Sequence, residues 1–137
     1  MKKTFRFFGF PLFLMVMIPI ILSCNSDDEP KPEPKSYFHI ENAGFKISAE
    51  AQTLEIRIHT NINVTTKVLR DTGNWFSILY AGSVEDCLNY RVTVNENTSP
   101  EERTVQIMFE PAAGTVITPD AEMGGNMVVI TQAGGEP

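Results

Sequence analysis

Residues of the types that usually carry chemistry are few in this chain of 137 residues, which has two cysteines, two histidines and one tryptophan. Neither His39 nor His59 lies in a G-x-S-x-G nucleophile motif or an H-E-x-x-H metal motif. A calcium site on Asp120 and Glu122 is disfavoured, because the surrounding loop lacks aspartates at alternate positions. We therefore expect no catalytic residues, no metal site and no cofactor, and the sequence predicts that the chain is not an enzyme.

Basic residues are also scarce, with 11 Lys and Arg against 17 Asp and Glu and a formal net charge of -6. Residues 1–23 contain three of the basic residues, so the chain without them has 8 basic against 17 acidic residues and a net charge of -9. Phosphate binding needs clustered Lys and Arg, and the sequence has no such cluster. Nucleic acid is therefore excluded as an expected partner.

The first 23 residues resemble a bacterial export signal, with a basic start, an apolar run over 7–22 and a small residue, Ser23, at the end. The sequence Ile21-Leu22-Ser23-Cys24 is similar to the lipobox of bacterial lipoproteins, in which the cysteine receives diacylglycerol before cleavage, although Ile21 and Leu22 replace that family's usual Leu and Ser or Ala. An uncleaved transmembrane helix is the alternative, but about 16 apolar residues are at or below the length that spans a bilayer. The resemblance implies lipid attachment at Cys24.

Residues 24–36 follow as a linker. The acidic stretch 25–29 resembles the signal that exports Bacteroidota lipoproteins to the outer face of the outer membrane, with a merely soluble spacer as the alternative. The alternating prolines of 30–35 favour an extended stalk, because each fixes φ and removes a backbone donor. We expect an outer-membrane, lipid-anchored chain facing the cell exterior, in which Cys87 has no disulfide partner; its role stays open.

Period-two alternation dominates residues 37–134, as in Leu54, Ile56 and Ile58, which alternate with polar residues. Turn residues such as Gly, Asn, Asp and Pro separate the alternating segments, and none has a helical period. The expected strands are residues 38–40, 44–48, 54–59, 63–69, 75–80, 90–95, 104–110 and 126–132. The sequence therefore predicts an all-β, immunoglobulin-like antiparallel β-sandwich of seven or eight strands, followed by a short tail, 135–137.

Three segments of this domain form a pattern: Tyr-Arg-Val-Thr-Val-Asn at 90–95, Glu-Arg-Thr-Val-Gln-Ile at 102–107 and Val-Val-Ile-Thr-Gln at 128–132. Together they resemble the BACON domain, a Bacteroidota-associated module often found N-terminal to carbohydrate-active enzymes, and Trp75 matches the tryptophan that opens the family's middle strand. Val64 departs from the pattern, because many members have an aromatic residue shortly after the position of Asn61. The resemblance implies an immunoglobulin-like fold and an association with glycan use.

Trp75 and Tyr80 are the candidate glycan-binding residues, because the C–H side of a sugar ring packs on an aromatic face and nearby polar groups meet its hydroxyls. The alternative for Trp75 is an ordinary core position. The sequence favours a surface-exposed, non-catalytic lipoprotein that binds glycans, of host mucin or polysaccharide, or acts in adhesion. The second hypothesis is a structural spacer or an interaction subunit of an outer-membrane uptake complex. The ligand, the protein partners and the oligomeric state stay open.

Overall fold

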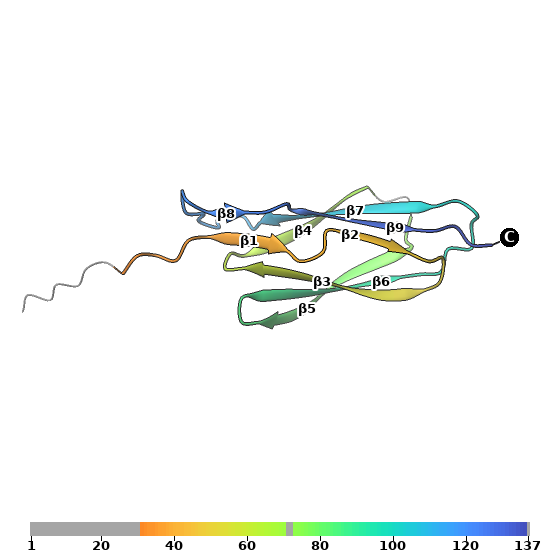
Figure 1. Cartoon of the computed structure of the whole chain (residues 1–137), viewed down its shortest axis with the longest axis horizontal. Helices are drawn as coiled ribbons and strands as arrows, with labels where there is room; N and C mark the ends of the chain where they lie inside the picture. Colours follow the sequence, from red (N-terminus) through yellow and green to blue (C-terminus); the bar gives the residue numbers. More distant parts are fainter. Residues whose placement is uncertain (1–30, 71–72, 137) are drawn as a thin grey trace, which may run out of the picture. The chain divides into compact units, whose positions relative to one another are not determined.

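Alternation of apolar and polar side chains produces the regular elements of this computed structural model, which describes residues 31–70 and 73–136 (Figure 1). All of these elements are strands. Within that part of the chain, no helix is long and apolar enough to cross a membrane. The predicted leader, the lipid attachment at Cys24 and the acidic stretch 25–29 lie outside the described residues.

Nine strands form two sheets that pack face to face in the unit Glu33–Pro137 (Figure 1). The strands are β1 (Tyr37–Ile40), β2 (Gly44–Ile47), β3 (Gln52–Thr60), β4 (Val64–Arg70), β5 (Phe76–Val84), β6 (Cys87–Val94), β7 (Arg103–Pro111), β8 (Glu122–Met123) and β9 (Met127–Gln132). One sheet has the order β5-β6-β3-β1-β8 and the other β2-β9-β7-β4. The predicted all-β sandwich is confirmed.

Two features of the sandwich differ from the prediction. Both sheets are mixed, because β1 pairs with β8 and β2 with β9 in parallel. The chain leaves the first sheet after Ile40 and enters the second at Gly44. The two strands β1 and β2 are thus consecutive in the sequence but belong to different sheets. The ninth strand is β8, two residues within a stretch whose prolines and glycines predicted only a loop. Both differences depend on pairing with strands that are distant in the sequence. The alternation of residues within one segment carries no information about that pairing.

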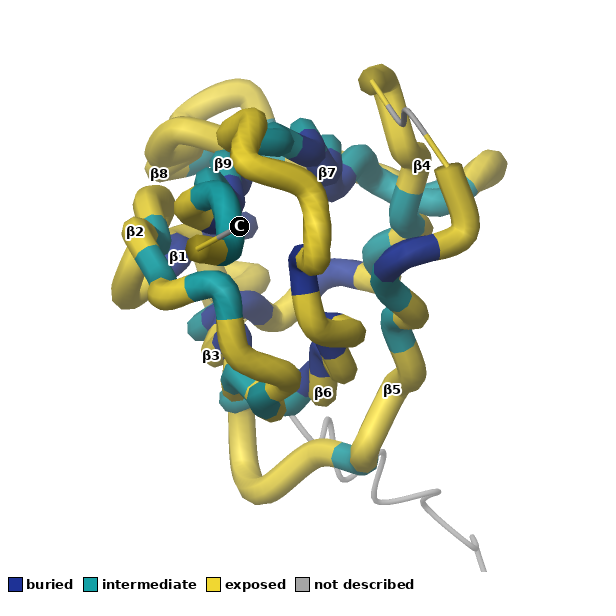
Figure 2. The backbone as a smooth tube through the Cα atoms, turned by 90° about the vertical axis from the view of Figure 1, so that its right-hand side faces the viewer, coloured by how far each residue is buried: buried dark blue, intermediate teal, exposed yellow. Residues whose placement is uncertain are grey.

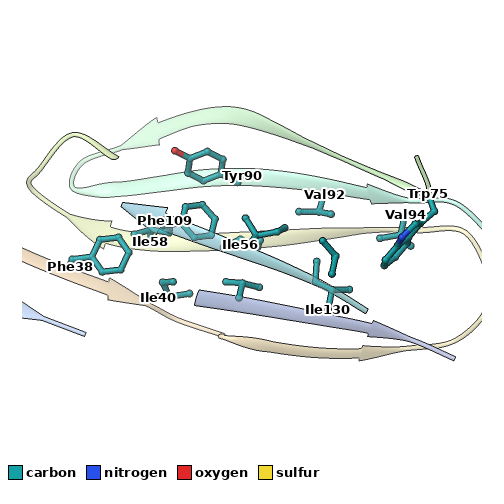
Figure 3. Packing of buried hydrophobic residues seen from close by; sticks show 13 residues of the cluster. Phe38, Ile40, Ile56, Ile58, Trp75, Tyr90, Val92, Val94, Phe109 and Ile130 are labelled. Carbon is teal, nitrogen blue, oxygen red and sulfur yellow. The ribbon is translucent and has the colours of Figure 1, made fainter. Parts of the chain in front are cut away.

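The buried apolar residues form one cluster between the sheets (Figure 2, Figure 3). In β3, Ile56 and Ile58 point inward while Glu55 and Arg57 are exposed, as the period-two pattern predicts. The most buried members are Phe38, Ile56, Ile58, Val92, Val94, Val105, Ile107, Phe109, Val128 and Ile130. Burial of each such side chain contributes roughly 1.5–3 kcal/mol, so this cluster is the main source of stability.

A buried polar network closes one end of the sandwich around Gln132, whose side chain is fully buried. Its Nε2 group donates to the carbonyl oxygens of Ala49 (3.0 Å), Glu50 (3.2 Å) and Asn95 (3.0 Å). Its Oε1 accepts a 2.8 Å hydrogen bond from Nε of Arg103. These contacts tie the 49–50 loop, Asn95 after β6 and Arg103 of β7 to β9.

Candidate functional site

Trp75 and Tyr80 lie at the start and in the middle of one extended segment, and they line two separate hollows. Tyr80 is in β5, and Trp75 directly precedes that strand. Five residues of extended chain span roughly 17 Å. A single sugar ring therefore cannot contact both aromatic side chains, and each hollow has to be considered by itself.

The first hollow, named the Tyr80 groove, lies where the edge strands β4 and β5 of the two sheets face each other and has a volume of about 410 Å³. Its lining residues are Ile62, Asn63, Val64, Thr65, Thr66, Ile78, Tyr80, Leu88 and Tyr90. Tyr80 is 51% exposed, and its ring meets the ring of Tyr90 edge-on, with 5.5 Å between the centroids. An exposed aromatic residue thus stands beside polar residues at the start of β4, namely Asn63, Thr65 and Thr66, and this combination of residue types suits a sugar.

Tyr90 fixes the floor of this groove. It is 7% exposed, and its ring also packs edge-on against Phe109 at 5.2 Å between centroids. Burial raises the pKa of the Tyr90 hydroxyl above its usual 10.0, and the neighbouring Tyr80 raises it further. The hydroxyl therefore stays protonated at neutral pH. Contacts on both sides of the ring hold Tyr90 in place, so Tyr80 rests on a rigid support.

The second hollow, named the Trp75 hollow, lies at the end of the sandwich closed by Gln132 and has a volume of about 800 Å³. Its lining residues are Arg70, Gly73, Asn74, Trp75, Asn95, Glu96, Asn97, Ser99, Glu101, Glu102, Arg103 and Thr104. The Trp75 side chain is 5% exposed and belongs to the core cluster. The guanidinium carbon of Arg103 lies 4.4 Å from the Trp75 ring centroid, so one aromatic face is already covered and this face offers no stacking platform.

A row of three ligand-type residues crosses the outer face of the first sheet, which sequence motifs did not reveal. His39 pairs with His59 across β1 and β3, and His59 pairs with Cys87 across β3 and β6. Register partners in antiparallel strands share a face, so these side chains are neighbours. Only the pairing register brings them together, since they are 20 to 48 positions apart in the sequence.

Two members of this row, His59 and Cys87, have other partners. Nε2 of His59 lies 2.7 Å from Oε1 of Glu41, a contact that lowers the pKa of the Glu41 carboxyl. The thiol of Cys87, which is half-buried, donates long 4.0 Å contacts to the Leu88 carbonyl and to Oδ1 of Asn89. No hydrogen bond joins His59 to Cys87 within the described residues. The row is therefore not a nucleophile–base pair in this structure.

Among residues 31–70 and 73–136, no group of three His, Cys, Asp or Glu side chains is placed to hold a metal ion. Asp120, one of the two residues considered for calcium, instead lies 3.6 Å from the Lys35 ammonium, and both of these side chains are exposed. Glu122 is part of β8.

No protein-family model matches the chain, and no curated protein matches it. Among solved structures, the chain is similar to a Bacteroides ovatus GH5 xyloglucanase in complex with a XXXG heptasaccharide, with 13% sequence identity and a TM-score of 0.53. The match covers 72% of this chain and 19% of the xyloglucanase chain. At this identity the likeness concerns the fold alone.

Proposed function

We propose that this chain is a non-catalytic lipoprotein module, held in the outer membrane through Cys24 and facing the cell exterior, that binds glycans in the Tyr80 groove. The observation that carries the proposal is Tyr80, which is half exposed and packs against Tyr90 in a groove that the edge strand β4 also lines. Two further points support it: the sequence resemblance to the BACON domain, and the fold likeness to part of a glycan-degrading enzyme.

Isothermal titration against mucin O-glycans, plant polysaccharides and the xyloglucan heptasaccharide tests glycan binding. We expect Tyr80→Ala to weaken the affinity for the bound glycan about tenfold or more, because loss of an aromatic contact costs roughly 1.5 kcal/mol. Tyr80→Phe keeps the ring and should retain most of the affinity.

Leu79→Ala is the matched control, because Leu79 is 65% exposed on the same strand and points to the opposite face. Its affinity should stay within twofold of the unaltered chain. Absence of heat with every glycan in the panel, for a folded chain, would rule out this role.

The lipid anchor has its own test. Cys24→Ser removes the thiol that the lipobox resemblance assigns to the acyl chains, so the chain should move from the membrane fraction to the soluble fraction. Mass spectrometry of the native protein should show an N-terminal acylated cysteine and no residues before it. A product that retains residues 1–23 would contradict the anchor.

The second candidate, an interaction subunit of an outer-membrane complex, is favoured by β5, an edge strand that has a neighbour on one side only among the described residues. This nine-residue strand has no charged residue, whereas the edge strands β4 and β2 contain Lys67 and Lys46. Leu79 and Val84 on β5 are 65% and 69% exposed. Charges on edge strands normally prevent pairing with other chains, so an uncharged edge favours strand addition by a partner protein.

Pull-down from detergent-solubilised outer membranes with the lipidated chain distinguishes this candidate from glycan binding. Leu79→Lys puts a charge on the free edge and should abolish recovery of a β5-dependent partner, while Tyr80→Phe should not affect it. Equal recovery with both variants would count against strand addition at β5.

A further inference from the structure

The chain enters the sandwich through a joint of hydrogen bonds at one end of the domain (Figure 1). The backbone N–H of Ser36 donates to Oγ1 of Thr118 (2.9 Å), and the backbone N–H of Thr118 donates to Oγ of Ser36 (3.1 Å). The Asn61 side chain accepts from the backbone N–H of Tyr37 (2.9 Å) and donates to the carbonyl oxygen of Lys35 (2.8 Å). This joint defines the stalk end of the sandwich.

The most exposed apolar residues lie at the stalk end. Val116 and Ile117, in the loop next to the joint, are 84% and 40% exposed. Val84, at the end of β5, is 69% exposed. The turn after β5 belongs to the same end, because Oδ2 of Asp86 accepts a 2.7 Å hydrogen bond from the Tyr37 hydroxyl. In the part of the chain that the structure describes, no other large apolar residue is as exposed as Val116 and Val84.

The loop over 112–118 has a composition that suits an apolar interface. It reads Ala-Ala-Gly-Thr-Val-Ile-Thr and contains no charged residue. The loop is held at both ends, because the Ala112 N–H donates to the Asn63 carbonyl oxygen (2.8 Å) and Thr118 bonds to Ser36. Exposed apolar groups that gather on one surface usually mark contact with another protein or with a membrane.

The position of Cys24 favours a membrane as the occupant. Cys24 lies 12 positions before Ser36, so the stalk end stays within roughly 40 Å of an acylated Cys24, the length of a fully extended segment of that size. A short tether keeps its two ends at an effective concentration of about millimolar, at which contacts too weak to hold a free domain are sufficient. The bilayer is therefore always within reach of the stalk end.

The charges at the stalk end select the kind of lipid. The carboxylates of Glu85 and Asp86 lie in the turn after β5, and Asp120 lies 3.6 Å from the Lys35 ammonium. Carboxylates outnumber ammonium groups among these four residues, and anionic lipid repels a surface with such an excess. The stalk end therefore fits a zwitterionic lipid surface better than an anionic one.

We propose that the stalk end docks on the lipid surface that holds the acyl chains of Cys24, with Val116, Ile117 and Val84 at the depth of the headgroups; this rests on the lipid anchor of the proposed function. The stalk then lies along the surface instead of standing upright. Because Val84 and Tyr80 belong to the same strand, docking also holds the Tyr80 groove at a fixed height above the membrane.

The lipidated full chain, reconstituted in phosphatidylcholine vesicles, tests docking through an environment-sensitive fluorophore on Val116→Cys, with Cys87→Ser to remove the other thiol. We expect the emission from position 116 to shift to the blue and to be quenched by nitroxide-labelled lipid. The same fluorophore on Leu69→Cys should show neither effect, because Leu69 is 43% exposed near the far end of β4 from the 112–118 loop.

Val84→Asp should reduce the quenching at position 116 about threefold or more, because it puts a charge where the lipid interface is expected. Leu79→Asp is the matched control, since Leu79 is 65% exposed on the same strand but away from the stalk end. It should leave the quenching nearly unchanged. Vesicles that contain phosphatidylglycerol should give less quenching than phosphatidylcholine alone.

A chain that stays on the vesicles through its acyl chains, with no quenching at position 116, overturns docking and leaves the anchor of the proposed function intact. A chain that does not stay on the vesicles overturns the anchor and docking together. Equal quenching at positions 116 and 69, or equal effects of Val84→Asp and Leu79→Asp, also overturns docking.

Discussion

At the scale of single residues, Gln132 shows how one buried amide holds distant segments together. Its Nε2 and Oε1 atoms bond to the 49–50 loop, to Asn95 and to Arg103. Asn97 acts similarly, donating from Nδ2 to the carbonyl oxygens of Glu101 (2.8 Å) and Ala133 (2.9 Å). A buried polar residue stabilises the fold only when all of its hydrogen-bond partners are present. Removal of the amide side chain leaves those partners unsatisfied and lowers the free energy of unfolding.

Gln132→Ala should lower the free energy of unfolding by about 3 kcal/mol, because it leaves buried carbonyl oxygens and the Arg103 Nε without partners. Urea unfolding monitored by Trp75 fluorescence measures the change. Gln52→Ala, which removes a half-exposed amide with one long 3.4 Å bond to Ser48, is the control and should change the free energy by less than about 0.5 kcal/mol. Equal losses in the two variants would contradict the role of Gln132.

Tyr90 lowers the free energy of unfolding at alkaline pH. Burial raises the pKa of its hydroxyl above 10.0 in the folded chain, while the unfolded chain titrates at the ordinary value. The contribution of the neutral Tyr90 hydroxyl to the free energy of unfolding is therefore complete below pH 10. It is lost as the pH rises through the higher pKa of the folded state. We expect the urea midpoint to fall more steeply above pH 10 for the unaltered chain than for Tyr90→Phe. Parallel curves for the two proteins would show that Tyr90 is not responsible.

At the scale of elements, β5 combines a free edge with a bulge. Its register against β6 shifts between Tyr80 and Gly82, and Gly82 has a φ of 120°. This backbone conformation is rare for residues with a side chain, so glycine permits the bend there. The pairing residues Tyr80 and Tyr90 lie immediately before the bulge, and the exposed ring of the groove therefore depends on where this strand bends.

Gly82→Ala should destabilise the domain by about 1–2 kcal/mol, because alanine is strained at that φ even though open space surrounds the position. Gly44→Ala is the matched control: Gly44 also has open space but no positive φ, so its substitution should be neutral or slightly stabilising. Thermal unfolding of both variants provides the comparison. A Gly82 variant as stable as the Gly44 variant would show that the bulge tolerates a side chain.

At the scale of the whole molecule, pairing between the ends of the domain holds the second sheet together. The last long strand, β9, lies between β2 and β7, and its partner in β2 comes from the start of the domain, as in Gly44 with Val129. Val128 and Ile130 from β9 are fully buried in the core. The second sheet therefore cannot form its complete buried face until β9 has been made.

A chain that ends after Asn126 should lack cooperative unfolding, because β2 and β7 lose their shared neighbour and the core loses two fully buried side chains. Near-ultraviolet circular dichroism of Trp75 and the tyrosines measures the loss of fixed packing. A chain that ends after Glu136 keeps β9 and serves as the control. A sigmoidal transition in the shorter chain would contradict the requirement for β9.

The sequence by itself determined the strands and the faces that they bury, because period-two alternation is a local pattern. All eight predicted segments contain strands, and Ile56, Val92 and Ile107 are buried as the alternation predicts. It also identified Trp75 and Tyr80 as the aromatic residues next to polar loops. The tertiary structure decided the two parallel pairings, the short strand β8 and the division of those two residues between separate hollows. These features depend on which distant strands become neighbours and which remain as edges, and hydrogen-bond pairing between segments leaves no periodic signal in either segment alone.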